Sequence, residues 1–152
     1  MSMRRIASLR RLRKARLTQR NAEGGRLAEA ENAMAAVRVS IQGARQAAMA
    51  LDDGLAERCQ GVIFANDLIG FEVERQAASE TIAALVADLE QRQSVVVAAR
   101  QAVADAELEL RRSEQVLEKS LLERNQSVSR EEQSNHDDLA NARHFFDKER
   151  DS

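Results

Sequence analysis

The chain has 152 residues, of which 43% are hydrophobic and 32% charged, with a formal net charge of −2 at pH 7. This composition fits neither a disordered chain nor a membrane-spanning one, because no stretch approaches the roughly 18 apolar residues of a transmembrane helix. Four Phe and no Trp or Tyr provide little bulk for a globular core. The absence of proline favours long uninterrupted helices, since an interior proline costs a helix about 3 kcal/mol.

The first 20 residues are the most basic part of the chain, with eight Arg or Lys and no acidic residue. We expect part of this charge to face Glu107, Glu114, Glu118 and Glu123 of the second helix, and the rest to be available to a partner. A protein is the favoured partner, because the chain has neither an aromatic stacking platform for nucleic acid nor a one-sided arginine face for a membrane. A charged helix that is only solvated, and a mitochondrial presequence, remain alternatives.

Two series of apolar residues recur alternately three and four positions apart, which is the heptad pattern of a coiled-coil seam, the stripe that faces a partner helix. The first series consists of Leu27, Ala30, Met34, Val37, Ile41, Ala44, Ala48, Leu51 and Leu55. The second consists of Phe71, Ala78, Ile82, Leu85, Leu89, Val96, Ala99, Val103, Ala106, Leu110 and Leu117, with Arg75, Arg92 and Ser113 at the remaining seam positions. Together they predict the core of a two-stranded coiled coil.

The segment between the two series, residues 61–70, carries two glycines and Asn-Asp and follows no heptad, so it predicts a hairpin turn. Asn66 or Asp67 could cap the second helix by accepting its free amide protons. If the chain reverses here, the numbers of paired residues sum to about 125 to 131.

The predicted fold class is therefore all-α, a single long antiparallel coiled-coil hairpin. Its first helix spans about 4–59, its turn about 60–67 and its longer second helix about 68–148. Residues 127–152 have no opposite helix in this hairpin, and we expect them either to overhang as a single helix or to fray.

Large apolar residues cluster at the predicted turn, where a two-stranded coil has no core to bury them. They are Val62, Ile63, Phe64, Leu68, Ile69 and Phe71. Some of them must pack across the turn, and any remainder forms a docking surface, because exposed apolar clusters are uncommon without a partner.

Catalytic and metal chemistry are not expected. Cys59 is the only cysteine, and His136 and His144 lie in the polar tail without a second ligand pair at metal spacing. No phosphate-binding glycine loop or nucleophile motif occurs. We therefore expect a cytosolic protein that is not an enzyme and uses neither a cofactor nor a metal.

The layout resembles the FliJ and YscO family, the central stalk proteins of flagellar and type III secretion export machines. The resemblance is carried by the amphipathic start Ile6-Ala7-Ser8-Leu9-Arg10-Arg11-Leu12, the alanine-rich coil, the short turn and the longer second helix. The closing segment Arg130-Glu131-Glu132-Gln133-Ser134-Asn135-His136-Asp137-Asp138-Leu139-Ala140-Asn141-Ala142-Arg143 also looks like the closing pattern of the family. Tyrosines and tryptophans that some members show near the turn are absent.

The resemblance implies a monomeric protein whose terminal half enters the pore of a hexameric secretion ATPase, while another part meets the cytoplasmic domain of the export gate. The implied ATPase-binding residues are Arg4, Arg5, Arg10, Arg11, Arg13, Arg16, Arg130, Asp137 and Asp138. The implied export-gate or tip-docking residues are Val62, Ile63, Phe64, Phe71, Arg75, Ala78 and Ile82.

The family also binds secretion chaperones, and it is held at the inner membrane only through its partners. We expect no nucleic acid among the partners. The alternative function is a generic coiled-coil adaptor that dimerises through its heptads.

Overall fold

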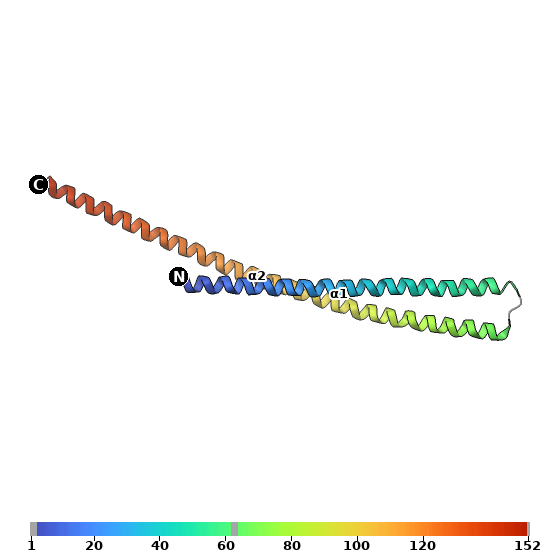
Figure 1. Ribbon diagram of the computed structural model, residues 1–152. Coiled ribbons are helices and arrows are strands. Elements are labelled where there is room, and N and C mark those ends of the chain that lie inside the picture. The colour runs from blue at the N-terminus through green and yellow to red at the C-terminus, as the bar shows by residue number, and fades with distance from the viewer. Residues whose placement is uncertain (1–2, 62–63, 152) are drawn as a thin grey trace. The chain divides into compact units, whose positions relative to one another are not determined.

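The computed structural model describes residues 3–61 and 64–151, and it contains two α-helices, α1 (Met3–Arg58) and α2 (Ala65–Arg150), shown in Figure 1. No strand occurs in the described residues. The predicted all-α helical hairpin with a longer second helix is thereby confirmed, since α1 has 56 residues and α2 has 86. No helix in the described ranges is long and apolar enough to span a membrane.

The turn between the helices is shorter than the sequence predicts, because α2 begins at Ala65 and not near residue 68. The carbonyl of Phe64 accepts hydrogen bonds from the amides of Asp67 (3.0 Å) and Leu68 (3.3 Å). Asn66 and Asp67 therefore lie inside the first turn of α2 rather than before it, so the prediction that one of them caps the helix is wrong. Asp67 still stabilises this end, because a negative charge in the first turn complements the helix dipole.

The helices contribute to two compact units. The terminal unit consists of Met1–Arg20 with Ala106–Ser152, and the turn unit consists of Asn21–Asp105. In the turn unit Val37, Ile41 and Val96 are buried, and every other apolar seam position is half-buried. In the terminal unit Ala106, Leu110 and Leu117 are buried or half-buried on α2, and Ile6 is buried on α1.

Ion pairs between the helices report their register. In the turn unit Arg75 pairs with Asp52 (3.2 Å) and Arg100 with Glu31 (3.5 Å). In the terminal unit α1 pairs with α2 through Arg13 and Glu114 (3.6 Å). The residue numbers of each pair sum to a value inside the expected range, so α1 and α2 run antiparallel in the same register within each unit.

Beyond this paired region α2 continues alone. It stays helical to Arg150, and every described residue from Asn125 onward is exposed. Figure 1 shows this end of α2, in orange and red, extending past the start of α1. We call residues 125–150 the free end of α2.

The buried seam predicts where the fold is sensitive to substitution. Ile41 is 6% exposed, so Ile41→Ala removes buried methyl groups and is expected to lower the free energy of unfolding by about 2–4 kcal/mol. Val39 lies two residues away and is 69% exposed, so Val39→Ala should change the free energy of unfolding by less than about 0.5 kcal/mol. Thermal and urea unfolding followed by circular dichroism measure both values, and equal losses in the two variants would contradict this placement of the seam.

Candidate functional site

In the terminal unit the seam of α1 continues at the heptad spacing but becomes charged. Ile6 is buried and Leu9 half-buried, whereas the next three seam positions hold Arg13, Arg16 and Arg20. An arginine at a seam position cannot bury its guanidinium between two helices, so it extends to the rim of the interface and reaches a carboxylate there.

Each of these arginines pairs with a glutamate of α2. Arg13 Nε lies 3.6 Å from Glu114, Arg16 Nη2 3.8 Å from Glu109 Oε2, and Arg20 Nη2 3.1 Å from Glu107 Oε1. The predicted contacts to Glu107 and Glu114 are present, and Glu109 was missed. Glu118 and Glu123, which were also expected to face the basic segment, have no ion-pair partner among the described residues.

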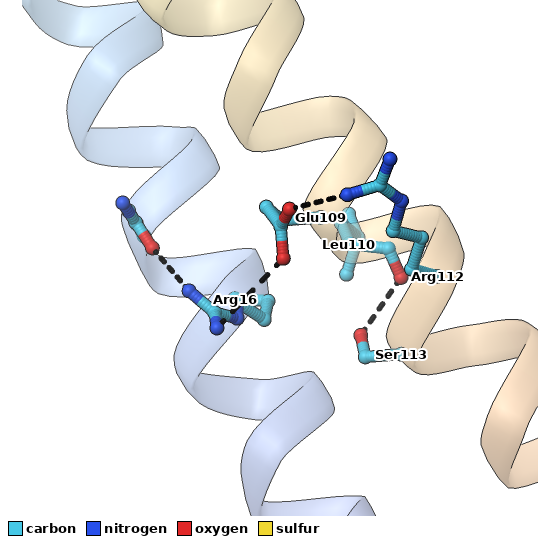
Figure 2. A network of polar contacts seen from close by, with 6 residues as sticks. Arg16, Glu109, Leu110, Arg112 and Ser113 are labelled. Atoms are coloured by element: carbon cyan, nitrogen blue, oxygen red, sulfur yellow. Dashed lines mark hydrogen bonds and ion pairs between the residues drawn. The ribbon is translucent and has the colours of Figure 1, made fainter.

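The centre of this charged interface is shown in Figure 2. Arg16 also donates from Nη1 to Gln19 (3.2 Å), and Glu109 also accepts from Arg112 Nη1 (2.9 Å). The neighbouring Ser113 is buried and donates its hydroxyl to the carbonyl of Leu110 (2.8 Å), which satisfies it within its own helix. Around Arg16 the interface therefore combines polar contacts with small side chains, and its large apolar residues, Ile6 and Leu117, lie nearer the N-terminus of α1.

The remaining basic residues of the first segment point away from this interface. Arg4, Arg10, Arg11 and Lys14 are exposed, and none of them has an ion-pair partner within the described ranges. We call these four residues the basic arm. Arg5 is exposed as well but takes part in a further polar contact.

The expected ATPase-binding residues thus fall into two groups. Those of the basic arm are available to a partner, whereas Arg13 and Arg16 are already engaged with α2. On α2 the expected Arg130, Asp137 and Asp138 are exposed on the free end, and only Asp137 forms a described contact, with Gln133 Nε2 at 3.5 Å.

A shallow apolar recess adjoins the basic arm. Its volume is about 530 Å³, and Leu117, Leu121 and Leu122 of α2 line it beside Arg13 and Glu114. Leu122 is exposed, and Val128 continues the apolar character into the free end. The terminal unit therefore offers positive charge on α1 and an apolar strip on α2.

The expected docking residues near the turn are also divided. Phe64 is 72% exposed, and Leu68, Ile69 and Val73 are exposed beside it on the first turns of α2. Phe71 is half-buried and lies under Arg58, whose guanidinium carbon is 5.5 Å from the ring centroid, a cation–π contact. Val62 and Ile63 lie outside the described residues.

The other residues expected to dock a partner belong to the helix interface. Arg75 is tied to Asp52, and Ala78 and Ile82 are half-buried in the seam. The surface that remains open near the turn therefore consists of Phe64, Leu68, Ile69 and Val73, which we call the apolar tip.

Comparison with family models, with curated proteins and with solved structures gave no match. Among the described residues, no three His, Cys, Asp or Glu side chains are grouped so that they could hold a metal ion. Cys59 is exposed and is a free thiol.

The charged part of the seam generates a stability prediction. Arg16→Leu should raise the free energy of unfolding by about 1 kcal/mol, because it replaces a solvated ion pair, itself worth about 0–1 kcal/mol, with apolar contact at a seam position. Arg111→Leu, on an exposed face of α2, serves as the control and should leave it unchanged. Chemical unfolding of both variants provides the measurement, and a loss of stability in Arg16→Leu would show that the ion pair contributes more than the packing.

Proposed function

We propose that the chain is a stalk protein of a type III export apparatus, flagellar or virulence-type, with no catalytic activity of its own. In this role the terminal unit enters the pore of a hexameric export ATPase, the apolar tip contacts the cytoplasmic domain of the export gate, and the exposed coil surface binds secretion chaperones. The protein would act in the cytoplasm and reach the inner membrane only through these partners.

The observation that carries the proposal is the composition of the terminal unit. Its basic arm has four cationic side chains without an ion-pair partner among the described residues, and the free end of α2 lies exposed on all sides in the same unit. A narrow pair of helices with cations on one helix suits a channel lined by acidic groups, since electrostatic complementarity fixes the orientation of the two partners and speeds their encounter.

The fold also supports a mechanical role. A two-helix pair packs its seam residues against one another, and it can pass a displacement along its helices. The sequence resemblance to the FliJ and YscO family supplies the identity of the proposed partners.

Capture by the ATPase tests the role of the basic arm. Arg10→Glu with Arg11→Glu should reduce binding to the ATPase of the same export system at least about tenfold, because two attractive contacts become repulsive. Both residues are exposed, so helicity by circular dichroism should stay unchanged. Arg38→Glu with Arg45→Glu makes the same charge change in the turn unit and should retain capture. Equal capture by both double variants would argue for the generic adaptor instead.

The apolar tip provides a separate test of the export-gate contact. Phe64→Asp with Ile69→Asp places two charges on exposed positions and should weaken binding of the isolated cytoplasmic domain of the gate at least about tenfold, while ATPase capture persists. Val95→Asp with Val97→Asp, at exposed positions farther along α2, is the matched control. Calorimetric titration with the gate domain measures the difference, and undiminished binding would remove the tip from the interface.

A further inference from the structure

A second recess lies in the turn unit, outside every surface considered so far. Its volume is about 540 Å³, and its floor is apolar, formed by Ile41 of α1 with Val86 and Leu89 of α2. Met49 is 65% exposed at its edge and extends the apolar surface of the floor. We call this recess the Arg38–Arg45 groove.

Two arginines stand on the rim of the groove. Arg38 and Arg45 are seven residues apart on α1, so they lie on one face about 10.5 Å apart along the helix axis. Both are exposed, and neither forms an ion pair with any described residue. The arginines of the seams, by contrast, are each matched to a carboxylate. The groove therefore combines an apolar floor with two unmatched cations at a defined spacing.

The free end of α2 carries the complementary pattern. Glu131 and Asp138 are also seven residues apart, both are exposed, and neither has an ion-pair partner among the described residues. Leu139, next to Asp138, is 60% exposed, and Val128 and Ala142 lie on the same side of the helix. Most of the stability of a helix in a protein comes from packing, so packing against another surface would stabilise the free end.

We propose that the free end of α2 from one copy of the chain docks into the Arg38–Arg45 groove of a second copy. The equal spacing brings one carboxylate to each guanidinium whichever way the incoming helix runs. Leu139 and its apolar neighbours then cover Ile41, Val86 and Leu89. Burial of these apolar side chains drives the contact, and the two charge pairs set its register.

The contact is small and belongs with weak interfaces, which bury less than about 1,200 Å² in total. It is independent of the proposed export function. If both hold, self-association covers the free end of α2 and withholds it from the ATPase until a partner competes for it.

The test is sedimentation equilibrium of the full chain between about 10 μM and 1 mM, a range that resolves weak association. The wild-type chain is expected to form a concentration-dependent dimer. Arg38→Glu with Arg45→Glu should raise the dissociation constant at least about tenfold, and Glu131→Lys with Asp138→Lys should do the same, because each creates two like-charge contacts.

Mixing the two double variants gives the decisive measurement. In the mixture, the groove that now carries two glutamates can bind the free end that now carries two lysines. The unchanged groove and the unchanged free end, which belong to opposite variants, keep their native charges and can also bind each other. The mixture should associate within about threefold of the wild-type constant, although each variant alone associates at least about tenfold more weakly. Arg111→Glu with Lys119→Glu, which makes the same net charge change at exposed residues outside the groove, should leave the constant unchanged.

Three outcomes would overturn the inference. The first is that the wild-type chain stays monomeric over the whole concentration range. The second is that the double variants dimerise like the wild type, which is the result expected if the chain dimerises through its seams. The third is that the mixture of the two double variants fails to associate. All substituted residues are exposed, so helicity by circular dichroism should stay unchanged. ATPase capture by the Arg38→Glu, Arg45→Glu variant separates this inference from the proposed function, since only the latter requires capture.

Discussion

The register between α1 and α2 is the constraint on which the rest of the structure depends. A seam residue is buried only if the opposite helix presents another seam residue at the same level, and a shift of one position would move Ile41 and Val96 toward solvent. The pairs Arg75–Asp52 and Arg100–Glu31 lie beside the apolar seam and are satisfied by the same alignment. Such exposed pairs contribute little energy, so the apolar seam sets the register and the ion pairs are compatible with it.

The two units use this register differently. In the turn unit aliphatic side chains meet across the seam, whereas in the terminal unit Arg13, Arg16 and Arg20 occupy the equivalent positions of α1. On α2 the buried Ala106 and Ser113 and the half-buried Leu110 lie at the corresponding levels. The unit that carries the basic arm and the free end therefore has the less apolar seam on α1.

Most of the fold could be predicted from the sequence, because an alternating three and four spacing of apolar residues has few physical interpretations. The start of α2 was predicted too late, since Asn66, Asp67 and Gly70 are typical of turns and are also tolerated in the first turns of a helix. The charged part of the seam was not predicted, because Arg13, Arg16 and Arg20 interrupt the apolar periodicity before Leu27. The pairing of Glu109 with Arg16 can be inferred only once the register between the two helices is known. The Arg38–Arg45 groove depends on side-chain positions that periodicity does not contain.

The arginine seam has a consequence for motion. A local opening around Arg16 exposes charged and small side chains that water solvates readily, whereas opening the turn unit exposes Val37, Ile41 and Val96. Amide protons near Arg16 and Ser113 should therefore exchange with solvent through local openings long before those beside Ile41. Full separation of the helices in the terminal unit would also expose Ile6 and Leu117, so the easier opening is a local one around Arg16, and a partner that inserts between the helices would meet the smaller barrier there.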